Sequence, residues 1–387
     1  MIWLSTGKRY YSKLKFVRGR AERERGCPRA PKFNIRNTKD FSMTILSRDP
    51  TNSWAGRIVR FSGAALTAIL IGLAPASGFA AEVELKFSHV NPPTHSSHTM
   101  ALFFAEQAKK LSNGRINIEV SPSGQLGGLK ASIDSAKLGT PIIAYAPASI
   151  AQDYAKTASI MDAAYMFDTV EHAERFINGA GGKVIWDDIE KAGLVRLFSS
   201  FFGTRQLWLR ECGKKPADFG KLKMRVPPAR IQAFNARANG LSPTPIDFPE
   251  TYGALQSGVV DGVDVTPSSF VASKFAETGL KCVMLSSHNF LMQPAFMNKK
   301  LFDAMAPELQ KALLDAGKAA AAYNKKLTNE EEGQILKTIT ADLGVKIVGP
   351  KDGLDLKAFR MNAAETIYPE FKKDWGQELL DQVEKTR

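Results

Sequence analysis

The chain has 387 residues, of which 44% are hydrophobic and 24% are charged, and this composition excludes a largely disordered protein. Its formal net charge of +13 would suit a nucleic-acid-binding protein. Residues 1–80, however, hold 15 Lys plus Arg against 4 Asp plus Glu, so the rest of the chain is nearly neutral and we expect no nucleic-acid partner.

An uncharged segment, residues 61–81, directly follows Arg60 and has a short apolar centre that leads into small residues. This order predicts a secretory signal peptide that is cleaved near Ala80, with an uncleaved membrane anchor as the alternative. The polar segment before Met43 is too long for the start of a signal peptide. It is either a disordered extension or precedes the true start of translation at Met43. We therefore expect residues 1–80, an N-terminal extension plus signal peptide, to lie outside the fold.

The first part of the remaining chain alternates between two periodicities. Apolar residues at every second position predict strands, and apolar residues at helical spacing predict helices. The predicted elements, in chain order, are a strand at 82–90, a helix at 99–111, a strand at 116–120, a helix at 129–138 and a strand at 142–145. This order of strands and helices predicts parallel pairing in an α/β sheet.

Helices at 171–177 and 182–192 and a strand at 195–198 continue this pattern. The pattern then restarts, with strands at 206–210 and 225–227 and helices at 231–238 and 249–257, the last after a turn-rich segment at 242–245. Two α/β halves result, joined by a strand that crosses between them. Residues 307–343 have helical composition without an internal Pro, which predicts one long helix that braces both halves; two helices split near Thr328 are the alternative.

Signatures of catalysis and metal binding are weak. The chain contains no G-x-S-x-G, C-x-x-C or H-E-x-x-H motif and no glycine-rich dinucleotide fingerprint, so we predict neither an enzyme nor a cofactor. His89, His95 and His98 could share a metal ion, but no acidic residue or Cys lies among them, and polar capping is the favoured interpretation. Asp261 and Asp264 could form an acid/base pair, and we interpret them as part of a solvated turn.

Two cysteines, Cys212 and Cys282, follow the signal segment. In an oxidising compartment they either form a disulfide or remain two separate buried thiols. The sequence leaves both alternatives open.

Arg225 lies in a Lys-Met-Arg-Val-Pro-Pro segment, where a strand precedes two prolines that stiffen the backbone. A guanidinium held on such a strand offers two parallel N–H donors to one carboxylate, and the ligand's charge strengthens both hydrogen bonds. The alternative is an arginine that pairs with a structural Asp or Glu. On these grounds Arg225 is a candidate carboxylate-binding residue.

Seven segments, in order along the chain, resemble the DctP-type solute-binding proteins of tripartite ATP-independent periplasmic (TRAP) transporters. They are residues 85–89 (LKFSH), 114–116 (GRI), 121–128 (SPSGQLGG), 203–206 (GTRQ), 223–227 (KMRVP), 242–250 (SPTPIDFPE) and 252–262 (YGALQSGVVDG). The resemblance implies an α/β, two-lobed periplasmic-binding-protein fold with a long helix bridging both lobes. It places lobe I at 81–202 and 291–330, and lobe II at 203–290 and 331–387.

The resemblance also implies a function. The protein would act in the periplasm, close over a small organic acid without changing it, and deliver it to the integral membrane permease subunits. We expect a monomer, with a dimer as the alternative. Competing interpretations are a sensory ligand-binding protein of the same fold and, from another class, a secreted α/β hydrolase or isomerase.

Five substrate-binding residues follow from the resemblance. Arg225 would grip the carboxylate, Arg205 is a second arginine near the ligand, Phe248 would pack on it, and Asn91 would contribute a polar contact from the first lobe. The family usually continues Asp-Gly with Gln-Glu-Asn-Pro, but this chain has Val-Asp-Val-Thr. Either Thr266 replaces the missing Asn, or the ligand lacks the acceptor that an Asn would contact.

Overall fold

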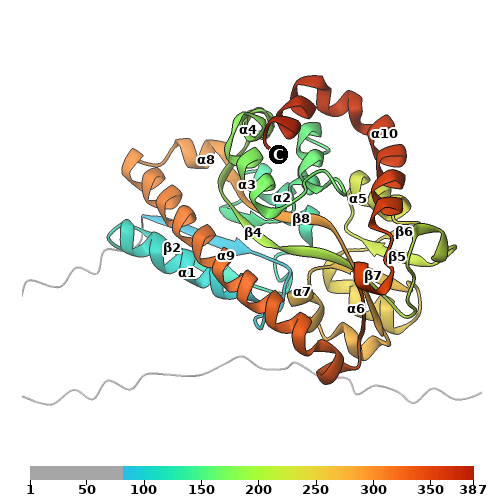
Figure 1. Ribbon diagram of the computed structural model, residues 1–387. Helices are drawn as coiled ribbons and strands as arrows, with labels where there is room; N and C mark the ends of the chain where they lie inside the picture. Colours follow the sequence, from blue (N-terminus) through green and yellow to red (C-terminus); the bar gives the residue numbers. More distant parts are fainter. Residues whose placement is uncertain (1–81) are drawn as a thin grey trace, which may run out of the picture. The chain divides into compact units, whose positions relative to one another are not determined.

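The computed structural model describes residues 82–387, which build a mixed sheet of nine strands flanked by helices (Figure 1). The predicted signal peptide, its cleavage near Ala80 and the alternative start at Met43 lie outside the described residues. Among residues 82–387, every helix is too short or too polar to cross a bilayer.

The strands are β1 Val83–Ser88, β2 Ile116–Ser121, β3 Ile142–Tyr145, β4 Leu194–Leu209, β5 Lys223–Val226, β6 Ser242–Pro245, β7 Gly262–Val265, β8 Cys282–Asn298 and β9 Lys346–Val348. The helices are α1 Ser96–Leu111, α2 Leu129–Lys137, α3 Val170–Asn178, α4 Ala180–Lys191, α5 Arg230–Ala238, α6 Thr251–Gln256, α7 Pro267–Ala272, α8 Lys299–Asp303, α9 Pro307–Leu343 and α10 Leu356–Lys385. Short 3-10 helices are η1 Ala148–Ala151, η2 Lys156–Asp162, η3 Pro216–Asp218, η4 Phe248–Glu250, η5 Phe275–Thr278 and η6 Pro350–Asp352.

The strand order is β2-β1-β3-β8-β4-β7-β5-β6, and β9 also pairs with β8. β1 pairs in parallel with β2 and β3, as predicted, and β5 pairs in parallel with β6 and β7. We call β1–β3 with α1 and α2 the first lobe, and β5–β7 with α5–α7 the second lobe. The long strands β4 and β8 lie between the two parallel groups, pair with each other antiparallel, and so connect the lobes.

Two strand predictions need correction. The predicted strands at 195–198 and 206–210 are parts of the one strand β4. Residues 242–245, predicted as a turn-rich segment, form the edge strand β6. Edge strands tolerate prolines when the missing N–H faces away from the neighbour. The amides of Ser242 and Ile246 donate to β5 and the segment before it, so Pro243 and Pro245 lie at the alternate, outward-facing positions.

A single helix, α9, spans 37 residues, which confirms the unbroken helix and makes the split near Thr328 wrong. It begins with Pro307 at its first position, where the missing N–H costs no helical hydrogen bond, and ends at Gly344, whose φ of 64° suits a helix C-cap. The helix packs against α1, β4 and α7, so it bridges both lobes (Figure 1). Thr328 is buried, and its hydroxyl donates to the carbonyl of Phe201.

The last helix, α10, packs on α5 of the second lobe and also on α4 and η2. The predicted division assigns residues 331–387 to lobe II and places α4 and η2 in lobe I. The ladder between β4 and β8 is irregular between Phe201 and Gly203 and again between Arg205 and Leu207. These irregularities lie where β4 passes from one predicted lobe to the other.

Cys212 and Cys282 form a disulfide, so the alternative of two separate thiols is wrong. The bond joins the end of β4 to the start of β8, where Leu209 already pairs with Cys282. It closes a loop between residues 70 apart, for which the chain-entropy estimate is about 4 kcal/mol of stabilisation. Such a bond persists in oxidising compartments.

Candidate functional site

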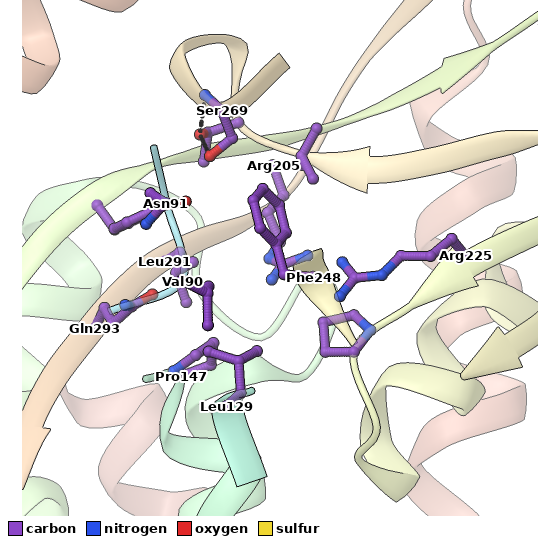
Figure 2. Close-up of a pocket in the computed structure, with 14 residues that line it drawn as sticks. Val90, Asn91, Leu129, Pro147, Arg205, Arg225, Phe248, Ser269, Leu291 and Gln293 are labelled. Carbon is purple, nitrogen blue, oxygen red and sulfur yellow. Dashed lines mark hydrogen bonds between the residues drawn. The ribbon is translucent and has the colours of Figure 1, made fainter. Parts of the chain in front are cut away.

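A narrow cavity of about 40 Å³ lies between the two lobes, near the carboxyl ends of β1, β5 and β7. In open α/β sheets this edge is the usual position of ligand sites. Figure 2 draws the residues of its walls. They are Val90, Asn91, Leu129, Pro147, Phe202, Arg205, Arg225, Pro227, Phe248, Val265, Thr266, Ser269, Leu291 and Gln293. All five residues predicted from the sequence are among them.

Arg225 extends from β5 toward the centre of the cavity (Figure 2). Its side chain is 1% exposed, and its Nε donates to the carbonyl of Ile246 at 2.8 Å. Its Nη2 is buried, and no hydrogen-bond partner lies within reach among residues 82–387. Burial, together with the charge of Arg205, lowers the pKa of Arg225 to about 9, so the guanidinium is charged at neutral pH. The cavity therefore contains a charged donor with unused hydrogen-bonding capacity.

Phe248, in η4, lies beside this guanidinium, whose Cζ is 5.4 Å from the ring centroid. The ring holds the arginine by a cation–π contact and covers one side of the cavity. Asn91 reaches the opposite side from the loop after β1, and its Nδ2 donates to the Ser97 hydroxyl at 3.1 Å. Aromatic and amide groups thus face each other across the cavity.

Arg205 also lines the cavity, but it has an acidic partner. Its Nη1 donates to the backbone carbonyl of Asp264 at 2.8 Å and to the Asp264 carboxylate at 3.0 Å. Both side chains are buried, and His288 Nε2 lies 3.1 Å from the same carboxylate oxygen. Burial alone would raise the pKa of the Asp264 carboxyl, but Arg205 and His288 outweigh it and hold this pKa well below its usual range. The positive charge of Arg205 is therefore already balanced by the carboxylate of Asp264.

This pairing corrects the interpretation of Asp264 as part of a solvated turn. Asp264 lies inside β7 and is 2% exposed. Asp261 does lie in a bend before β7, where its carboxylate accepts from the amide of Lys223 at 2.8 Å. The sequence did contain a signal for this pairing. Asp264 lies within the mostly apolar run Val259–Val265, and a charge on a buried strand requires a partner.

Thr266 follows β7 and caps α7, with its hydroxyl accepting from the amide of Ser269 at 3.3 Å. The same hydroxyl donates to Ser269 Oγ at 3.0 Å and lies 3.1 Å from Ser268 Oγ. Thr266 lines the cavity, but its hydrogen-bonding capacity is largely used within α7.

The three histidines serve the first lobe. His95 caps α1, as the capping interpretation predicted, because its Nδ1 accepts from the amide of Ser97 at 3.0 Å. Its Nε2 lies 3.1 Å from Ser269 Oγ of the second lobe. Burial lowers the pKa of His95 to about 3, so the ring is neutral, and the hydrogen-bond pattern assigns the remaining proton to Nε2. His89 Nε2 and His98 Nδ1 are 3.1 Å apart.

Sequence reasoning missed most of the apolar wall. Leu129 begins α2, Pro147 precedes η1, and Leu291 belongs to β8, so the wall comes from distant elements. Within residues 82–387 no three His, Cys, Asp or Glu side chains are arranged to hold a metal ion. The site can therefore bind an anion through Arg225 and enclose an apolar group beside it.

Comparison with known proteins identifies the family of this chain. Residues 87–374 match the family described as "Bacterial extracellular solute-binding protein, family 7", also called DctP. The chain belongs to this family. A relative, the "C4-dicarboxylate-binding periplasmic protein DctP" of Rhodobacter capsulatus, is 29% identical over 287 residues, which cover 72% of this chain and 84% of that protein.

Solved structures of TRAP periplasmic solute-binding proteins share the fold of this DctP-family chain. The protein from Sulfurospirillum deleyianum, with bound succinate, is 28% identical with a TM-score of 0.72, over 80% of this chain and 100% of the other. The protein from Actinobacillus succinogenes, with bound L-galactonate, is 25% identical with a TM-score of 0.73, over 79% of this chain and 99% of the other. These similarities confirm the predicted family and the two-lobed fold.

Proposed function

We propose that this chain is the periplasmic solute-binding component of a TRAP-type transporter, which captures a small organic carboxylate between its lobes and delivers it to the membrane permease. The observation that carries the proposal is the buried Arg225, whose Nη2 has no partner among the described residues. A ligand carboxylate would supply the acceptors, and a hydrogen bond between charged groups is about twice as strong as a neutral one.

Closure of the lobes would follow binding. Three contacts join the lobes around the cavity: His95 with Ser269, and two glycines that leave room for side chains of the second lobe. A Cβ on Gly128 would lie 2.3 Å from Asp247 Oδ2, and one on Gly124 would lie 2.8 Å from Pro249 Cγ. A ligand that touches both lobes favours the state in which these contacts form.

We further propose that the protein does not change its ligand chemically. A serine and a histidine do meet at the cavity, in Ser269 and His95, as in a nucleophile and its base. A histidine base must accept the hydroxyl proton, however, and His95 Nε2 already carries a proton because Nδ1 accepts from a backbone amide. This pair therefore supports closure and not catalysis.

Titration calorimetry with Arg225→Ala tests the function. We expect the variant to bind any cognate acid at least about 30-fold more weakly, because losing one partner of a buried charge pair costs about 2–5 kcal/mol. Arg237→Ala is the matched control, since Arg237 is exposed on α5 and does not line the cavity. Near-native affinity in Arg225→Ala would refute the role of this residue.

A further inference from the structure

Among residues 82–387, Arg225 lines the cavity and has no acidic hydrogen-bond partner. Two arginines and no acidic side chain line it, but Arg205 is neutralised by Asp264 directly behind it. Arg225 donates only to a backbone carbonyl through its Nε. Asp264 and Asp247 favour the charged form of Arg225 without forming an ion pair with it, so one ligand carboxylate would supply the direct acceptor that its guanidinium lacks.

The walls away from Arg225 are mostly apolar. Val90, Leu129, Pro147, Leu291 and Val265 contribute hydrocarbon surface, and Figure 2 shows Leu129, Pro147 and Val90 on the side across from the Arg225 side chain. A second carboxylate placed against these residues would lose its hydration without gaining a cationic partner.

The polar side chains of the wall are few and already make hydrogen bonds within the protein. Asn91 Nδ2 donates to Ser97, and Gln293 Nε2 donates to the carbonyl of Tyr145 at 3.2 Å. The Thr266 hydroxyl bonds within α7. Asn91 and Gln293 each keep one N–H and the carbonyl oxygen. A polyhydroxy acid brings more hydroxyl groups than these few side chains can pair, and each one left without a partner costs about 1–3 kcal/mol.

We infer that the ligand is a small monocarboxylate whose substituent is a compact, branched hydrocarbon, with its carboxylate on Arg225 and its hydrocarbon against Leu129, Pro147 and Val265. This inference rests on the proposed function and names the substrate class of the same cavity. It separates this chain from relatives that bind dicarboxylates or sugar acids.

Calorimetry with four acids tests the inference on the purified wild-type protein. Isovalerate and α-ketoisovalerate carry one carboxylate and a branched hydrocarbon; succinate, with as many non-hydrogen atoms as α-ketoisovalerate, carries a second carboxylate, and L-galactonate carries hydroxyls. We expect at least one branched acid to bind at least about 100-fold more tightly than succinate or L-galactonate, because an unpaired buried carboxylate costs more than two tenfold steps in affinity.

A conservative variant tests the apolar wall. Val265→Thr keeps the branched shape on β7 and replaces one methyl group by a hydroxyl. We expect it to weaken binding of the preferred branched acid about 3- to 10-fold. Unchanged affinity would refute the contact between the hydrocarbon and Val265.

The results of these measurements distinguish a failure of the inferred substrate class from a failure of the proposed function. If succinate or L-galactonate binds more tightly than both branched acids, and Arg225→Ala abolishes this binding, the substrate class is wrong and the function stands. If none of the four acids raises the melting temperature or releases heat, the substrate class is refuted, and the proposed function is then judged by whether another organic acid binds and Arg225→Ala loses that binding.

Discussion

Glu332 is a half-buried residue at the crossing between the lobes. It lies on α9, and its Oε1 accepts from the backbone amide of Thr204 at 2.9 Å. The chain approaches it closely at Gly203, whose φ is 137° and where a Cβ would lie 2.3 Å from the same oxygen. Burial raises the pKa of Glu332 from 4.5 to about 8, although the amide of Thr204 favours the charged form.

The raised pKa predicts a stability that depends on pH. Between 4.5 and about 8 the folded state holds a proton that the unfolded chain has released, so the free energy of unfolding falls as pH rises through this window. A shift of 3.5 pKa units corresponds to about 5 kcal/mol in full, of which about 4 kcal/mol falls between pH 5 and pH 9. Glu332→Gln keeps an oxygen for Thr204 and removes the titration.

Urea denaturation of wild type and Glu332→Gln at pH 5, 7 and 9 measures the effect. We expect the variant to gain up to about 4 kcal/mol relative to wild type from the lowest to the highest pH. Because other titrating groups are common to both proteins, the difference between the two isolates Glu332. A difference that stays constant with pH would show that this carboxyl is not protonated in the folded state, and would refute the reasoning.

Three further variants test features of the fold. Gly128→Ala should place a Cβ against Asp247 and weaken ligand binding by about 10-fold or more while the melting temperature of the ligand-free protein is retained; unchanged affinity would contradict a closed state with this contact. Cys282→Ser should lower the free energy of unfolding by about 2–5 kcal/mol, and reductant should then have no additional effect on its urea midpoint. Asp264→Asn should cost about 3–5 kcal/mol, because Arg205 becomes an uncompensated buried charge; a loss below about 1 kcal/mol in urea denaturation would count against the buried pair.

Local signals predicted local structure well. The alternation in the first segment predicted β1 at Val83–Ser88, and Pro-free helical composition predicted α9 over its full length. The run around Arg225 predicted a strand with a rigid end, and the side chain does face a cavity. In each case the pattern and the structure depend on the same few neighbouring residues.

Long-range features were harder to predict. The sequence did not predict β8, because the polar run Ser286–Asn289 interrupts its apolar pattern. Pairing with β4 nevertheless supplies hydrogen-bond partners for the backbone of β8 on one side. The pairing of Arg205 with Asp264 joins two strands that are distant in the sequence. The apolar wall is assembled from loop ends and strand ends, and no periodicity within one element indicates which ends will meet.

The sharing of β4 and β8 between the lobes also constrains how the chain folds. β3 is synthesised early, yet its partner β8 comes from the last third of the chain, with Ala144 beside Phe296. The first lobe therefore cannot complete its sheet until most of the polypeptide has been synthesised. Until then, one edge of β3 remains unpaired. Unpaired strand edges invite aggregation, and distant pairings fold slowly. For this architecture, the delay before β8 arrives is the interval in which the nascent protein depends most on chaperones.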